Sequence, residues 1–181
     1  MIWKFTDNKS RDSIEQQFDW ARNMNEVPQD KLYHAEGNVA VHTWKVIEEL
    51  QQLPAYSDLG GQDKEILWTA ALLHDVEKRS ATVVESDGRI TARGHARKGE
   101  YTVRTLLYRD LPTPFAIREK IASLVRFHGL PLWLMEKTDP VRKIAEVAFR
   151  LDTSQLRMLA EADIRGRICQ DREELLESLD L

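Results

Sequence analysis

A histidine and an aspartate stand side by side at the end of an apolar segment of this chain, and the pair is His74-Asp75. Apolar residues from Ile66 to Ala71 recur at helical spacing, so the His74 imidazole should continue the buried face of a helix. A buried imidazole beside a buried carboxylate needs a partner, and a divalent cation is a strong candidate. A metal site here requires further ligands that converge on this pair.

Three other histidines occupy positions comparable to that of His74. His42 lies on the apolar face of a predicted helix, His128 ends another apolar helix, and His95 begins a third. For His42 alone, a hydrogen-bonded core residue is the more frequent arrangement. Stabilisation by the helix dipole is the alternative for His74 and His128, because each ends a helix.

Two late aspartates have different expected roles. Asp152 precedes a helix and is best explained as its N-cap. Asp163 lies one turn after Leu159 on the apolar face of the same helix, where an ionised carboxylate is costly unless it meets a cation. We therefore expect Asp163, rather than Asp152, to be a metal ligand.

These side chains together form a ligand set of nitrogen and oxygen atoms without a thiolate. Such a set suits manganese, cobalt, nickel, copper, zinc or iron better than an all-oxygen calcium or magnesium site. Six ligands exceed the need of one ion, whereas two divalent ions bridged by Asp75 would use them and could act on a phosphoryl group. The expected metal ligands are His42, His74, Asp75, His95, His128 and Asp163.

The composition is that of one globular domain with a sizeable core, since the 181 residues are 42% hydrophobic and 31% charged. The net charge of -4 argues against binding nucleic acid through a broadly basic surface, but it permits a local basic site. The single cysteine, Cys169, excludes an internal disulfide framework, so we expect a cytoplasmic protein. No apolar run has the length of a membrane span, and residues 1–11 lack the apolar core of a signal peptide, so no membrane partner is expected.

The apolar periodicity predicts an all-α fold with one exception. Between residues 82 and 92, two short β-prone runs flank Ser86-Asp87-Gly88, which predicts a small β-hairpin. Asn38 is an expected N-cap, and residues 54–61 are expected to form a turn-rich linker. Helices are expected over residues 10–24, 39–53, 96–108, 115–127 and 171–179. Three further helices are expected: one ends at His74, one begins at Pro140 and one follows Asp152.

The order of these residues resembles the HD superfamily of metal-dependent phosphohydrolases, a family of helical-bundle domains. It is similar to the HD domain of bacterial transfer-RNA nucleotidyltransferases, and more similar still to HD domains fused to a polynucleotide kinase in bacterial end-healing enzymes. The resemblance covers residues 31 to 181 and implies one HD domain over residues 1–181, as the N-terminal part of a longer protein. Its motifs are His34-Ala35-Glu36-Gly37-Asn38, His42-Thr43, Ala71-Leu72-Leu73-His74-Asp75 and Ala160-Glu161-Ala162-Asp163-Ile164-Arg165-Gly166-Arg167.

The resemblance implies a phosphoesterase that acts on 3′-phosphate or 2′,3′-cyclic phosphate ends of RNA or DNA, with a polynucleotide kinase domain in cis. The chain itself has no Gly-x-x-x-x-Gly-Lys-Ser/Thr loop. We expect His42, His74, Asp75 and Asp163 to hold one metal, and Asp75, His95 and His128 to hold the other.

A metal-activated water is then expected to attack phosphorus, with His74, Asp75 and Lys78 as catalytic residues. Lys78 is expected to neutralise the phosphate, and its alternative role is a solvated helix end. His34 and Lys98 are further candidates for substrate binding, each with a surface role as the alternative.

Two positions depart from the family pattern, since Glu77 replaces a glycine and Phe127 replaces a histidine present in many two-metal relatives. Three alternatives remain open at this point. The chain could hydrolyse free nucleotides or cyclic nucleotides, or it could be a non-catalytic HD module that binds RNA. It could also be a helical domain whose histidines are satisfied within the core.

Overall fold

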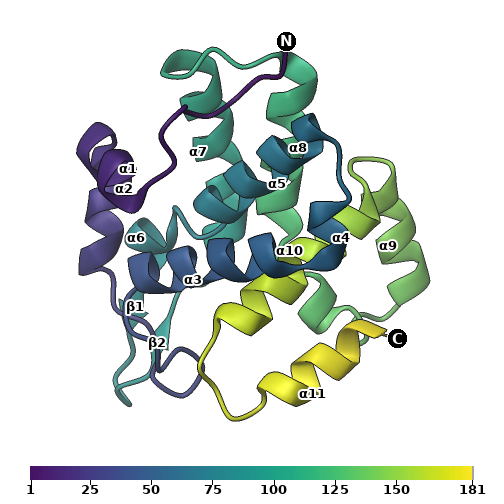
Figure 1. Cartoon of the computed structure of the whole chain (residues 1–181). Coiled ribbons are helices and arrows are strands. Elements are labelled where there is room, and N and C mark those ends of the chain that lie inside the picture. Colours follow the sequence, from purple (N-terminus) through teal and green to yellow (C-terminus); the bar gives the residue numbers. More distant parts are fainter. Residues whose placement is uncertain (181) are drawn as a thin grey trace.

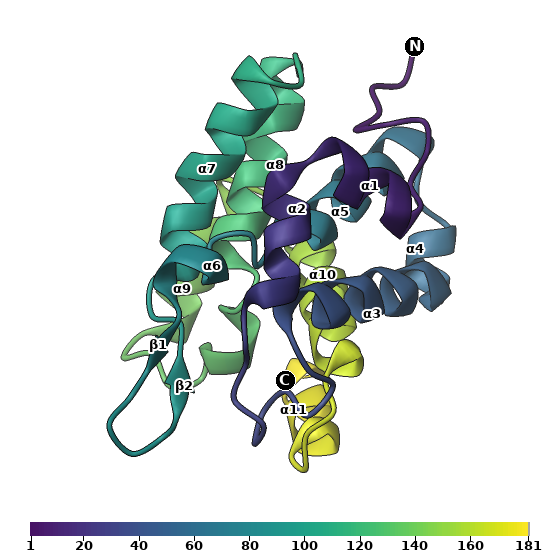
Figure 2. The ribbon, with the colours of Figure 1, turned by 90° about the vertical axis from the view of Figure 1, so that its left-hand side faces the viewer.

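The computed structural model describes residues 1–180, which fold into packed helices with one two-stranded sheet (Figure 1). This arrangement confirms the predicted all-α fold with one small hairpin. The central helices are α3 (Val39–Gln52), α5 (Gly61–Leu73), α8 (Phe115–Phe127) and α10 (Thr153–Gly166). Helix α7 (His95–Arg109) packs along α8, as Figure 2 shows from the side.

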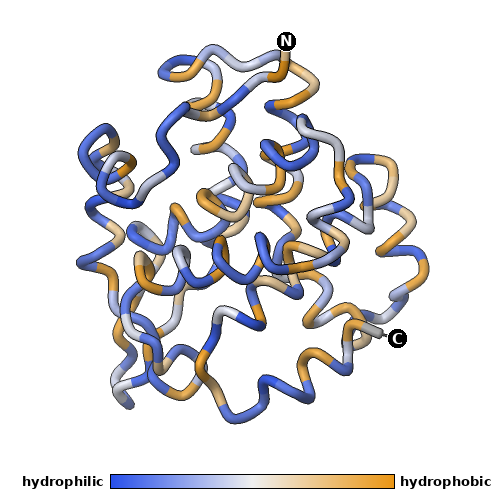
Figure 3. The backbone as a smooth tube through the Cα atoms, in the orientation of Figure 1, coloured by the Kyte–Doolittle hydropathy of each residue, from blue (hydrophilic) through white to orange (hydrophobic). Residues whose placement is uncertain are grey.

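Shorter elements surround this centre. They are α1 (Arg11–Gln17), α2 (Asp19–Asn23), η1 (Met24–Glu26), α4 (Pro54–Ser57), α6 (Lys78–Ala81), η2 (Pro131–Trp133), α9 (Pro140–Ala148), α11 (Arg172–Glu177) and η3 (Ser178–Asp180). Figure 3 shows hydrophobic and hydrophilic residues alternating along the outer helices. Along α11, Leu175 and Leu176 pack against a small buried cluster that includes Ile164 of α10.

Helix α5 is the core helix, because every residue from Ile66 to Leu73 is buried. A helix that is apolar on nearly all sides must be enclosed by other elements, and α5 contacts α3, α8 and α10. The residues that follow Leu73 therefore leave the helix inside the molecule rather than at its surface.

The hairpin pairs β1 (Val83–Val84) with β2 (Ile90–Thr91) in antiparallel register, with Val83 opposite Thr91. It falls within the predicted residues 82–92. The hairpin is held to a distant loop, because the Ile90 backbone N–H donates to Asp30 Oδ2 at 2.9 Å. This hydrogen bond holds the hairpin beside the loop that precedes α3.

The predicted continuous helix over residues 10–24 is wrong, because Phe18 interrupts it with extended backbone at φ -128° and ψ 112°. The interruption turns the Phe18 ring into an aromatic cluster, with its centroid 5.3 Å from that of Phe5 and 5.5 Å from that of Trp20. Contacts among these aromatic rings stabilise the fold more than one continuous helix over residues 10–24 would.

The residues expected to form a turn-rich linker also include a helix, since Pro54 occupies the first turn of α4. Proline suits this position because its missing N–H would have no partner there. The predicted N-caps are confirmed: Asn38 accepts a hydrogen bond from Val41 N, and Asp152 accepts one from Ser154 N, each at 2.9 Å. Within residues 1–180, no helix combines the length and apolar character needed to cross a membrane.

Helices α3 and α10 approach closely at Gly166. A Cβ atom added there would lie 2.9 Å from Val46 Cγ2 and 3.0 Å from Val46 N, so part of the obstruction is backbone. We expect Gly166→Ala to lower the free energy of unfolding by about 1–3 kcal/mol, measured by urea denaturation. Gly129→Ala is the matched control, because its added Cβ meets nothing within 4 Å. Equal stability of the two variants would contradict this packing.

Candidate metal centre

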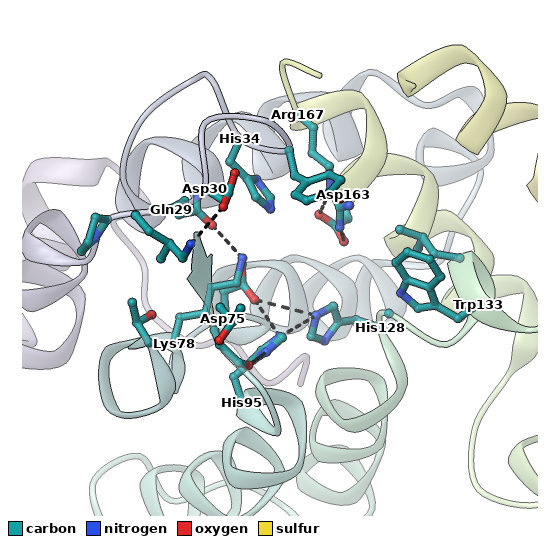
Figure 4. Close-up of a pocket in the computed structure, with 18 residues that line it drawn as sticks. Gln29, Asp30, His34, Asp75, Lys78, His95, His128, Trp133, Asp163 and Arg167 are labelled. Atoms are coloured by element: carbon teal, nitrogen blue, oxygen red, sulfur yellow. Dashed lines mark hydrogen bonds and ion pairs between the residues drawn. The ribbon is translucent and has the colours of Figure 1, made fainter. Parts of the chain in front are cut away.

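The candidate ligands come from five helices or their ends. His74 and Asp75 follow α5, His128 follows α8, His95 is the first residue of α7, His42 lies within α3, and Asp163 lies within α10. Figure 4 shows Asp75, His95 and His128 on one side of a cavity, with Asp163, Arg167 and His34 opposite them. The core thus brings together side chains that are far apart in the sequence.

Three imidazoles share one hydrogen-bonding pattern. The Nδ1–H groups of His74, His95 and His128 donate to carbonyl oxygens three residues earlier, at 2.7, 2.7 and 2.8 Å. A neutral imidazole that donates through Nδ1 has a free lone pair on Nε2. These backbone bonds therefore prepare three Nε2 atoms as metal ligands.

His42 is oriented by a carboxylate instead. Its Nδ1 lies 2.9 Å from Glu36 Oε1, and the same oxygen lies 2.8 Å from His34 Nδ1. Burial raises the pKa of Glu36, but hydrogen bonds from His34 and His42 outweigh it and hold the pKa well below its usual range. The site expected from the sequence did not include Glu36. Its place within the His34–Asn38 motif, two residues after His34, could have identified it as part of the site.

Asp75 lies at the centre of the cluster. Its Oδ2 is 3.2 Å from His74 Nε2, and its Oδ1 is 3.2 Å from His95 Nε2 and 3.8 Å from His128 Nε2. Burial raises the pKa of Asp75, but the positive charges of His74 and Lys78 outweigh it and keep the carboxyl ionised. One buried carboxylate thus faces three imidazoles.

The ligand atoms form two groups of three that share Asp75. His42, His74 and Asp75 make the first, Asp75, His95 and His128 make the second, and within each group the ligand atoms lie within 4.8 Å of one another. These are the sets expected from the sequence, apart from Asp163.

The residues present fit a divalent transition metal. Among the described residues, His74 Nε2 and Asp75 Oδ1 are buried without a hydrogen-bond partner, which is costly unless a cation satisfies them. His95 Nε2 and His128 Nε2 lie 3.3 Å apart, and two lone pairs this close also favour a cation between them. Burial and the neighbouring His74 and His95 lower the pKa of His128 to about 3, so this ligand is neutral and ready to coordinate.

A proton competes with metal at His74. Burial lowers the pKa of His74, but the Asp75 carboxylate outweighs burial and raises the pKa overall. The cluster without metal can thus hold a proton near the place where a metal would bind, so metal binding should release it.

Asp163 stands apart from both groups. Its Oδ1 is 3.0 Å from His42 Nε2, while its Oδ2 is 2.7 Å from Arg167 Nη2. Burial raises the pKa of Asp163, but Arg167 and His42 outweigh it and hold the pKa well below its usual range. The cation expected beside this buried carboxylate is therefore an arginine in this structure. The spacing of four residues within a helix could have identified Arg167 from the sequence.

Of the three residues expected to bind substrate, two line the cavity and one does not. Lys78 is buried at the cavity wall, with Nζ 2.8 Å from Asp75 Oδ2 and 2.6 Å from Gln29 Oε1. His34 lines the same cavity, and burial and nearby positive charge lower its pKa to about 4. Lys98 lies outside it, because its Nζ donates to the Ser80 carbonyl on the exposed side of α7. The structure therefore brings His34 and Lys78 to the site and leaves Lys98 out.

Both departures from the family pattern point away from the cavity. Glu77 accepts hydrogen bonds from Arg79, Ser80 and Thr102, which tie α6 to α7. The Phe127 ring lies beneath the charged groups of Arg126, Lys143 and Arg150. Neither side chain displaces a candidate ligand.

The cavity has a volume of about 390 Å³, and its wall includes Tyr33, Lys78, Trp133 and Arg167 beside the candidate ligands. Tyr33 and Trp133 are each 49% exposed, so both present aromatic surface at the mouth. Two cations and two aromatic rings around a metal-ligand cluster suit a phosphorylated, partly aromatic substrate.

Comparison with known proteins identifies the family. Residues 39–163 match the HD domain, so this chain belongs to the HD domain family, which indicates a metal-dependent hydrolase. It is also similar to the Multifunctional CCA protein of Nitrosococcus oceani, with 29% identity over 152 residues. That match covers 78% of this chain and 33% of the relative, so the chain spans about a third of the relative's length.

Two carboxylates separated by one residue provide a direct test of the centre, because Asp75 faces it and Glu77 faces away. We expect Asp75→Asn to weaken divalent metal binding by at least about tenfold, since it removes the ligand common to both groups. Glu77→Gln should retain the metal content of the unmodified protein. Elemental analysis after dialysis against buffered Mn²⁺ measures both, and equal loss from the two variants would contradict the assignment.

Proposed function

We propose that this chain is a metal-dependent phosphoesterase that removes 3′-phosphate or 2′,3′-cyclic phosphate from RNA or DNA ends. The observation that carries the proposal is the pair of ligand groups that share Asp75. Asp75, His95 and His128 line a cavity that also contains Lys78 and Arg167, and the first group lies buried behind Asp75. Carboxylate and imidazole ligands beside two cations are the arrangement that phosphoryl transfer requires.

Two divalent transition metals are proposed, one on His42, His74 and Asp75 and the other on Asp75, His95 and His128. Asp163 could complete the first set if its contact with Arg167 opens. Bound there, such ions would lower the pKa of a water and neutralise phosphoryl oxygens. No side chain of the chain is then needed as a nucleophile.

The surrounding residues prepare the site for a phosphate. Lys78 and Arg167 are paired with Asp75 and Asp163, so their charges are already held at the cavity and need little reorganisation. His34 is neutral near pH 7, because its lowered pKa keeps it unprotonated, and its Nδ1–H is directed at Glu36. Its Nε2 can therefore accept a hydrogen bond from a substrate hydroxyl.

Nucleic acid is the proposed substrate because of two similarities. The sequence resembles end-healing HD domains, and the Multifunctional CCA protein is a relative of the chain. The same resemblance supports a polynucleotide kinase domain in cis as the partner. A kinase assay on the natural gene product would test that part of the proposal separately.

A free nucleotide or cyclic nucleotide is the second candidate substrate. It is favoured by the size of the cavity, about 390 Å³, and by the aromatic surfaces of Tyr33 and Trp133 at its mouth. A cavity of this size could enclose one nucleotide. The two candidates differ in whether the substrate continues beyond the cavity.

A screen of metals against substrates tests the proposal. We expect release of phosphate from a 3′-phosphorylated oligonucleotide, with a higher kcat/KM than for free nucleotides, in the presence of Mn²⁺, Co²⁺, Ni²⁺, Cu²⁺, Zn²⁺ or Fe²⁺. Higher kcat/KM for a free nucleotide would favour the second candidate. Nucleic-acid binding that is indifferent to chelation, without hydrolysis under any metal, would instead indicate a non-catalytic module.

Two lysines separate a role at the cavity from a general effect of charge. We expect Lys78→Ala to lower kcat by about 10²–10³, because it removes a buried cation beside the reacting phosphate. Lys98→Ala removes the same charge outside the cavity and should leave kcat near that of the unmodified protein. Steady-state phosphate release measures both rates, and a comparable fall in both variants would refute the role of Lys78.

A further inference from the structure

A second cavity opens beside the candidate metal centre. It has a volume of about 580 Å³ and shares His95, His128, Gly129 and Trp133 with the first cavity. A molecule bound at the metal centre could therefore continue into this second space without leaving the protein surface.

The wall of the second cavity is positively charged, and among the described residues it contains no carboxylate. Its cations come from three regions of the chain, namely the first turn of α7, the end of α8, and the segment from η2 to α9. They are Arg97, Arg126, Lys137 and Lys143. This concentration of charge contrasts with the net charge of -4 of the whole chain. It is the local basic site that such an average permits.

Two of these cations are available for a ligand. Among the described residues, Arg97 and Lys137 form no ion pair, and both are exposed. Arg126 lies 3.4 Å from Glu100, and Lys143 lies 3.3 Å from Glu146, so these two are already partly neutralised. An anion in this cavity would thus be attracted chiefly by Arg97 and Lys137.

Trp133 stands where the two cavities join. Its side chain belongs to both walls and is 49% exposed, and Figure 4 shows the ring on the His128 side of the first cavity. An exposed indole beside a row of cations can stack with a nucleobase while the cations contact phosphates. This combination is typical of single-strand binding, because the bases of a duplex are not free to stack on protein.

We propose that the second cavity binds a single-stranded polynucleotide on the 5′ side of the phosphate that enters the metal centre. Trp133 stacks with a base near the end of the strand, and Arg97 and Lys137 contact the phosphates that precede it. This inference rests on the proposed function, and it explains how a polynucleotide end would be preferred over a free nucleotide. An acidic peptide could satisfy the cations, but it would leave the indole at the junction without a partner.

Binding measurements test the charged wall without depending on catalysis. The probe is a fluorescein-labelled single-stranded oligonucleotide with a 3′-hydroxyl end, titrated at several salt concentrations with each protein. We expect the double variant Arg97→Ala with Lys137→Ala to bind roughly five times more weakly for each lost phosphate contact at about 0.1 M salt. The slope of log K against log salt should become shallower by about 0.7 per contact.

The matched control is the double variant Arg109→Ala with Lys120→Ala. It also removes one arginine and one lysine charge, but from exposed positions outside both cavities. The affinity for the oligonucleotide and the salt slope should therefore match those of the unmodified protein. Equal affinity of the Arg97/Lys137 variant and the unmodified protein would overturn the proposal. Equally tight binding of an acidic peptide of the same charge would overturn the assignment to nucleic acid.

Variants of Trp133 test the stacking surface. We expect Trp133→Ala to weaken oligonucleotide binding roughly tenfold and Trp133→Phe to restore most of it, because any aromatic face can stack with a base. Failure of Phe to restore binding would count against stacking. Circular dichroism of each variant checks that it is folded.

Kinetics separate this inference from the proposed function. We expect the Arg97/Lys137 variant to lower the ratio of kcat/KM for a 3′-phosphorylated oligonucleotide to kcat/KM for a 3′-mononucleotide. An unchanged ratio, with hydrolysis intact, would overturn the strand path and leave the phosphoesterase standing. Charge-dependent binding without hydrolysis under any metal would support the strand path and overturn the phosphoesterase.

Discussion

The hydrogen bonds from three imidazole Nδ1 atoms to backbone carbonyls are the constraint on which the site depends. His74 and His128 end buried helices and His95 begins one, and each ring is held by the carbonyl three residues earlier. The backbone thus determines which nitrogen carries the proton and where Nε2 is directed. Because α5 is enclosed on nearly all sides, Asp75 follows it into the space between these rings. The packing of the core therefore also sets the positions of the candidate metal ligands.

Much of the fold could be predicted from the sequence, because apolar spacing within one helix reports which face is buried. That pattern placed His42, His74 and His128 inward and identified Asp163 as a buried carboxylate. It could not identify contacts that depend on distant segments. Glu36 is positioned by a loop whose Ala35 N–H donates to the Ile168 carbonyl at 2.9 Å, and Glu36 itself accepts from Ile168 N at 2.8 Å. The interruption at Phe18 likewise depends on contacts with Phe5, which lies outside the predicted helix.

The two residues that depart from the family pattern are explained by their surroundings. Glu77 serves as a hydrogen-bond acceptor between α6 and α7, so its charge is used for packing and does not reach the metal centre. Phe127 supports a group of cations at the edge of the second cavity. The net charge of the chain permitted a local basic site but could not locate it, because net charge does not report how cations are distributed around one opening.

The central claim is that Asp75 is shared by two metal positions. Anomalous X-ray diffraction from crystals of the protein grown with Mn²⁺ or Zn²⁺ tests it most directly. The account predicts two anomalous peaks, one beside His42 and His74 and the other beside His95 and His128, with Asp75 in contact with both. A single ion that Asp75 does not contact, or ions bound only at other residues, would contradict it.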